Sequence, residues 1–146
     1  MASKVVLDTN VFLNVINRKE PHYGPSKELL DLVDAGEARA IVSVITIAVL
    51  STGYHLVNNE SGRKEFMLHL LSSENYEVAD VNVGVADSAG RIRAETGLRL
   101  PDSIIVASGF RGDADFIVTQ DEESLKASEY LKSTIPEKMV RGLKPD

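Results

Sequence analysis

The chain has 146 residues, a formal net charge of -6 and no cysteine, with 43% hydrophobic and 26% charged residues. This length suits a single globular domain over residues 1–146 with a core of its own. The composition predicts no disulfide, no thiolate metal site and no membrane-spanning segment, disfavours a broad basic surface for passive nucleic-acid binding, and favours a cytoplasmic protein.

Apolar runs typical of strands alternate with segments of helical spacing in the first half of the chain. Strands are predicted at 5–7, 38–44 and around 76–83, and helices at 11–16, 26–36, 47–57 and 63–71. Ser26 and Thr46 are predicted to cap the second and third of these helices, because hydroxyl side chains favour that position. Gly36 is expected to end the second helix.

The second half continues the alternation. Helices are predicted at 85–96, 102–109 and 124–130, a buried strand at 116–118, and a polar tail at 136–146. Residues 98–101 read as an extended connection, since a residue before proline is pushed out of the helical region. Strands that alternate with helices predict an α/β fold with a mostly parallel sheet covered on both faces.

Three acids occupy comparable places in this predicted fold. Strand 5–7 leads directly into Asp8, strand 116–118 leads into Asp121, and Asp102 follows Pro101 at the first turn of an apolar helix. Ligands gather at the carboxyl ends of parallel strands, so the three carboxylates are expected to share one crevice. Clustered carboxylates repel one another unless a cation lies between them, and Mg²⁺ or Mn²⁺ prefers such oxygen ligands. A cation held there can activate water and neutralise charge at a phosphate.

The alternative interpretation is that the acids are unrelated. Asp, Thr and Asn all favour helix caps, so Asp8 alone is better explained as the cap of the next helix. Asp102 in a first helical turn also suits the helix dipole. Both interpretations remain open at the level of the residues.

Four segments together resemble the PIN domain, the metal-dependent ribonuclease fold found in VapC-type toxins. They lie at 6–10, 43–46, 98–107 and 117–121, and their order and spacing carry the resemblance over nearly the whole chain. The resemblance implies an α/β/α sandwich and hydrolysis of RNA with Mg²⁺ or Mn²⁺ in an acidic pocket. It also implies homodimers and, for toxins, an antitoxin protein that blocks the pocket.

The resemblance also implies roles for individual residues. Asp8, Asp102 and Asp121 match the family's metal-binding and catalytic acids, and Glu123 matches a less constant further acid. Apart from the resemblance, the position of Arg99 beside the Asp102 segment makes it a candidate for contact with the RNA backbone, and a solvated surface is the alternative. Polar residues that would support the acids are Thr9, Asn10, Thr46 and Thr119.

One position departs from the family pattern. Three residues after Thr46, where the family normally has Glu, this chain has Val49. Valine neither binds metal nor takes a proton, and metal affinity follows the number of charged ligands. We therefore weigh two hypotheses: an RNA endonuclease with a weakened site, and a catalytically impaired PIN-like module that binds RNA or a protein partner.

Overall fold

The computed structural model describes residues 3–144, and within them five strands form one parallel sheet. The strand order is β3-β2-β1-β4-β5, so β1 lies at the centre. The strand bounds are β1 Ser3–Leu7, β2 Ala38–Ser43, β3 Tyr76–Ala79, β4 Phe116–Val118 and β5 Ser133–Thr134.

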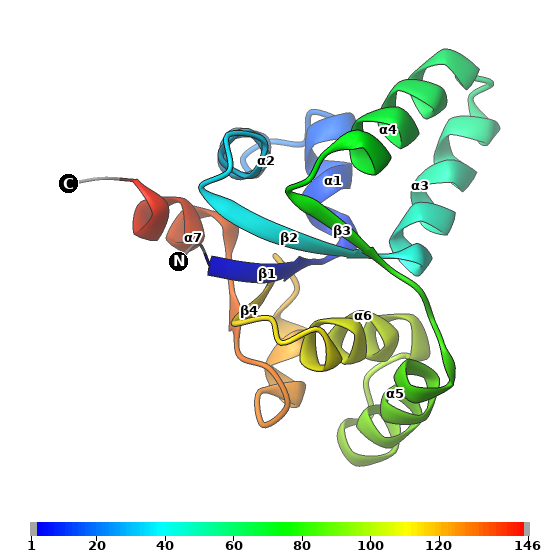
Figure 1. The fold of residues 1–146 in the computed structure, drawn as a ribbon, viewed down its shortest axis with the longest axis vertical. Coiled ribbons are helices and arrows are strands. Elements are labelled where there is room, and N and C mark those ends of the chain that lie inside the picture. Colours follow the sequence, from blue (N-terminus) through cyan, green and yellow to red (C-terminus); the bar gives the residue numbers. More distant parts are fainter. Residues whose placement is uncertain (1–2, 145–146) are drawn as a thin grey trace.

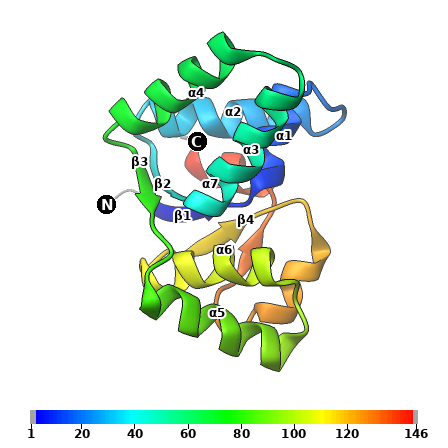
Figure 2. The ribbon, with the colours of Figure 1, turned by 90° about the vertical axis from the view of Figure 1, so that its right-hand side faces the viewer.

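Helices cover both faces of the sheet (Figures 1 and 2). One face carries α1 Thr9–Ile16, α2 Tyr23–Asp34, α3 Val44–Leu56, α4 Glu60–Ser72 and α7 Pro136–Leu143. The other carries α5 Val83–Thr96, α6 Leu100–Arg111 and the 3-10 helix η1 Glu122–Ala127. The predicted α/β/α sandwich with a parallel sheet is therefore confirmed. In the part of the chain described, no helix has the length and apolar character needed to cross a membrane.

The central strand β1 shows why the sheet needs helices on both sides. Val5 and Leu7 pack into the core beneath α1, α2 and α7, whereas Val6 packs into the core beneath α5 and α6. All three side chains are fully buried. Burying each one stabilises the fold by about 1.5–3 kcal/mol, so a short apolar run suffices to fix this strand at the centre.

Helix α6 approaches β1 unusually closely at Gly109. A Cβ atom at this position would lie 2.4 Å from Val6 Cγ1 and 2.8 Å from Leu131 Cδ2. We predict that Gly109→Ala lowers the free energy of unfolding by about 1–3 kcal/mol, because the strand and helix must separate to admit the methyl group. Urea denaturation followed by circular dichroism measures this change.

Gly90 in α5 provides the matched control. No neighbouring atom lies within 4 Å of the place where its Cβ would be. Gly90→Ala should therefore raise the free energy of unfolding by up to about 1 kcal/mol, the usual gain in helix propensity. Equal stabilisation by both substitutions would contradict the close approach at Gly109.

Two predicted caps are wrong. Helix α2 begins at Tyr23, so Ser26 lies inside it, where its buried Oγ accepts a hydrogen bond from Asn14 Nδ2 at 3.2 Å. Helix α3 begins at Val44 and is capped by Ser43, while Thr46 is buried one turn later. A hydroxyl that finds a tertiary partner tolerates the helix interior, and sequence alone does not reveal that partner.

The predicted polar tail is largely a helix. Residues 136–143 form α7, in which Pro136, Met139 and Val140 are buried against the core that contains α2. Proline suits the first turn of a helix, and the spacing of the three residues places them on one face. Residues 145–146 lie outside the described part of the chain. Strand β5 was not predicted, because two residues carry no periodic signal.

Candidate functional site

The site lies where the order of the strands reverses. From β1 the chain moves outward through β2 and β3, then returns by way of α5 and α6 to place β4 on the other side of β1. The helix that follows β1 and the helix that precedes β4 cover opposite faces, which leaves a crevice at the carboxyl ends of these two strands. Asp8 follows β1 directly, and Thr119 follows β4 directly.

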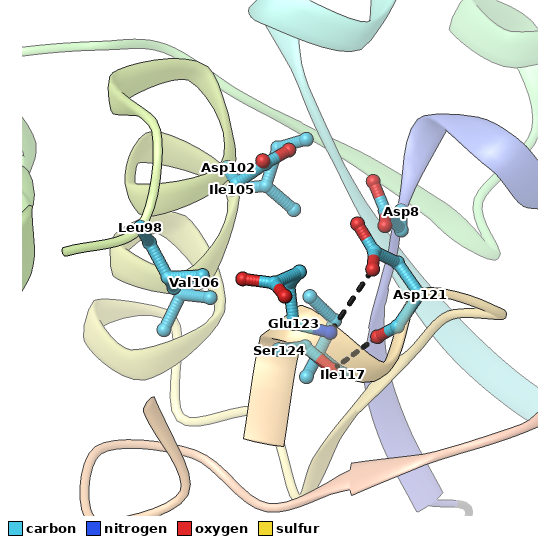
Figure 3. Close-up of a pocket in the computed structure, with 9 residues that line it drawn as sticks. All are labelled: Asp8, Leu98, Asp102, Ile105, Val106, Ile117, Asp121, Glu123 and Ser124. Atoms are coloured by element: carbon cyan, nitrogen blue, oxygen red, sulfur yellow. Dashed lines mark hydrogen bonds between the residues drawn. The ribbon is translucent and has the colours of Figure 1, made fainter. Parts of the chain in front are cut away.

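Four predicted acids line one small cavity at this crevice (Figure 3). Asp8 comes from the end of β1, Asp102 from the first turn of α6, and Asp121 and Glu123 from the segment that begins η1. The cavity measures about 10 Å³, room for roughly one water molecule. Its remaining walls are Leu98, Ile105, Val106, Ile117 and Ser124.

Asp8 is both a helix cap and a wall of the cavity, so the two interpretations of this residue are compatible. One carboxylate oxygen accepts from the backbone N–H of Thr9 at 2.7 Å, and the other accepts from Thr119 Oγ1 at 2.6 Å. Burial raises the pKa of Asp8, opposed by these two hydrogen bonds and reinforced by the charges of Asp102 and Asp121. The site thus holds the carboxylate in place while disfavouring its charge.

The predicted supporting residues form a polar network around Asp8. Asn10 Nδ2 donates to Asp8 at 3.2 Å and to Thr119 Oγ1 at 3.0 Å, and the Asp121 backbone N–H donates to Thr119 Oγ1 at 2.9 Å. The hydroxyls of Thr9 and Thr46 lie 2.8 Å apart, which ties α1 to α3. The network fixes the ends of β1 and β4 relative to each other.

The comparisons with known proteins place this arrangement in a family. The model of the PIN domain matches residues 5–129. The chain belongs to the PIN domain family. No curated relative matches the sequence.

Several solved structures share the fold of this PIN domain at low sequence identity. One is VapBC2 from Rickettsia felis bound to a DNA fragment from its promoter, with a TM-score of 0.68 and 19% identity over 90% of this chain and 98% of that chain. A toxin-antitoxin complex from Klebsiella pneumoniae has a TM-score of 0.68 and 19% identity, over 90% of this chain and 97% of that chain. DNA-bound VapBC from Salmonella typhimurium has a TM-score of 0.66 and 22% identity, over 92% of this chain and 98% of that chain.

Two acids of this PIN domain site have basic partners that the sequence analysis missed. Arg99 Nε lies 3.0 Å from Asp102 Oδ2, and Lys126 Nζ lies 2.5 Å from Glu123 Oε2. In each pair the two residues are three positions apart in a helical segment, the spacing at which opposite charges meet. That spacing was the available signal. The site therefore contains cations of its own.

Val49 faces the same site. A wider groove of about 450 Å³ runs past Asp8, Asp102 and Asp121, and Arg99 is also part of its wall. Val49 lines this groove and is 45% exposed. The other apolar residues that line it are Leu13, Ile45, Pro101 and Ile105. Position 49, at which the resemblance described above predicts Glu, thus lies beside the acids and carries a hydrocarbon surface.

The donor set of this PIN domain fits a hard divalent cation. All four cavity acids offer carboxylate oxygens, the ligand type that Mg²⁺ and Mn²⁺ prefer. Burial and its acidic neighbours make Asp8 costly to ionise without a cation nearby. As placed, however, no three Asp, Glu, His or Cys side chains within residues 3–144 converge closely enough to hold an ion. The ligand atoms are therefore of the type that a divalent cation binds, and the side chains would have to move closer together to coordinate it.

Proposed function

We propose that this PIN domain is a VapC-type RNA endonuclease that hydrolyses phosphodiester bonds with Mg²⁺ or Mn²⁺, and that Val49 weakens its site. The observation that carries the proposal is that four acids from three separate segments line one cavity at the strand-order reversal. Neither sheet packing nor helix capping requires acids from three distant segments to line the same space.

In this proposal Asp8, Asp102 and Asp121 hold the cation and Glu123 assists them. A bound cation supplies two effects: it lowers the pKa of a water nucleophile and neutralises charge on the phosphate. The hydrogen bonds from Thr119 and Asn10 hold the Asp8 carboxylate in one orientation.

Two further groups of this chain act on the RNA. Arg99 lines the groove, and in this proposal its guanidinium pairs with a backbone phosphate of the RNA strand. The apolar side chains that line the groove reduce the access of bulk water to it.

The proposal extends to protein partners. The solved relatives include toxin-antitoxin complexes, which supports an antitoxin for this chain, and we also propose a homodimer. Large apolar side chains at the end of α3 and on α4 are exposed at 63–78%, which favours a protein contact on this part of the surface. They are Leu56, Val57, Leu68 and Leu71.

A second candidate function follows from Val49 alone. With one carboxylate fewer than the family pattern, the same fold could bind RNA or a protein partner without cleaving RNA. This candidate predicts retained RNA binding without metal-dependent hydrolysis.

The first test uses the wild-type protein and a single-stranded RNA of mixed sequence. We expect cleavage in the presence of Mn²⁺ or Mg²⁺, none with excess EDTA, and recovery when the metal is restored, because the acids alone cannot neutralise the phosphate. Denaturing gels measure the products. RNA binding without cleavage under any metal condition would favour the second candidate and contradict the first.

A further inference from the structure

The geometry of α6 points to a competition for Asp102, an inference that rests on the proposed metal site. We propose that Arg99 acts as an internal counter-cation: it pairs with Asp102 while the site lacks metal, and a divalent cation displaces it. The displaced guanidinium then becomes available to a phosphate of the RNA. Arg99 is thus a positioning residue that lowers metal affinity and couples metal binding to substrate binding.

The pair consists of one fixed and one free partner. Arg99 Nε donates to Asp102 Oδ2 at 3.0 Å, which occupies one of the two carboxylate oxygens through which Asp102 could bind a metal. The side chain of Asp102 is 25% exposed, whereas that of Arg99 is 77% exposed. Asp102 therefore stays at the cavity wall, and the guanidinium can leave it for solvent without losing buried contacts.

The charge around Arg99 extends beyond its hydrogen-bonded partner. The pKa of Arg99 is raised first by the hydrogen bond to Asp102, then by the charge of Asp102, with smaller contributions from Asp121 and Asp8. Clustered carboxylates repel one another, and a guanidinium in the groove that all three line relieves part of that repulsion. This is the electrostatic role that a divalent cation fills more completely.

The backbone role of Arg99 is separable from its side chain. Its carbonyl oxygen accepts from Ser103 N at 2.9 Å and from Ser103 Oγ at 3.0 Å, at the start of α6. No side-chain cap hydrogen bond is made at this end of the helix. Replacing the guanidinium by an uncharged amide therefore leaves the start of α6 in place.

The experiment compares wild-type protein, Arg99→Gln and Arg91→Gln by titration of the metal-free proteins with Mn²⁺ in a calorimeter. We expect Arg99→Gln to bind Mn²⁺ about two- to fivefold more tightly, the range set by an exposed ion pair. The difference should shrink at high ionic strength, because salt screens the exposed pair. Arg91 pairs with Glu95 on α5, outside the groove, so its replacement should leave Mn²⁺ affinity unchanged.

The second arm measures binding of a 2′-O-methyl RNA in saturating Mn²⁺, and denaturing gels verify that the RNA stays intact during the measurement. Arg99→Gln should bind this RNA more weakly than wild type, and its dependence on salt should fall by about one phosphate contact. Arg99→Lys keeps the positive charge but loses the planar guanidinium, so its Mn²⁺ affinity should lie between that of wild type and that of Arg99→Gln. Thermal unfolding of each metal-free variant verifies that it is folded.

The possible outcomes distinguish a failure of the Arg99 competition from a failure of the proposed metal-dependent function. Unchanged or weaker Mn²⁺ binding by Arg99→Gln, with clear binding by wild type, overturns the competition and leaves the metal site standing. The absence of Mn²⁺ binding in all the proteins overturns the proposed metal-dependent function and this inference with it. Tighter Mn²⁺ binding together with weaker RNA binding supports both steps.

Discussion

Replacing Asp8 by Asn should reduce metal-dependent RNA cleavage by more than about 100-fold, because even residues that only support a metal ligand cost 10- to 100-fold when changed. Asn has the same shape, and its oxygen can still accept the hydrogen bond from the Thr9 backbone. The variant loses the charge that would hold the cation. Initial rates on a labelled RNA at saturating Mn²⁺ measure the loss.

The fold should survive this substitution. Burial raises the pKa of Asp8, which means that the folded chain disfavours the charged form, and a neutral amide avoids that cost. This gain offsets the loss of the hydrogen bonds that Thr119 and Asn10 donate to the second carboxylate oxygen, which an amide NH2 cannot accept. We therefore expect a change in Tm of less than about 4 °C, equivalent to about 1 kcal/mol for a chain of this size. Asp87→Asn, an exposed acid on α5, is the control and should retain full activity. Equal cleavage by wild type and Asp8→Asn would remove Asp8 from the mechanism.

Replacing Val49 by Glu should tighten Mn²⁺ binding by about tenfold or more and raise the rate of cleavage at limiting metal. The side chain at this position lines the groove beside Asp8 and Asp102. An added carboxylate near a bound cation is worth several kcal/mol in an environment of intermediate polarity, and 1.4 kcal/mol already gives tenfold. Because Val49 is 45% exposed, the new charge need not be buried.

Val49→Gln distinguishes charge from shape in this experiment. It has the length of Glu but no charge, so its Mn²⁺ affinity should stay near that of wild type. Calorimetric titration of the three proteins under one buffer condition provides the comparison. Identical affinities across all three would show that position 49 does not weaken the site.

The sequence predicted the parts of the site that depend on local pattern. The runs Val5-Val6-Leu7 and Phe116-Ile117-Val118 are apolar because β1 and β4 are largely enclosed between helices, and each run stops at polar residues. Parallel strands align their carboxyl ends, so acids far apart in the chain could be placed together before any coordinates were known. That inference required only strand identity and direction.

The parts that the sequence did not predict depend on tertiary partners. The sequence around Thr46 is compatible with two roles: the cap of a helix, and a position inside a helix whose hydroxyl forms a hydrogen bond with that of Thr9. Helix α7 looked like a polar tail because its apolar face is narrow, and only the core that contains α2 explains its burial. The ion pair between Arg99 and Asp102 was visible as a spacing, but its effect on the site depends on where both side chains point.

The distance along the chain between the two halves of the site has a consequence for biosynthesis. The hydrogen bond from Thr119 to Asp8 joins residues 111 positions apart. A ribosome makes Asp8 before it makes β4 and Asp121, because synthesis runs from the N-terminal to the C-terminal side of the chain. A nascent or prematurely released chain that lacks β4 therefore carries Asp8 without the partners that orient it. The proposed nuclease activity therefore begins only after β4 and Asp121 have been synthesised.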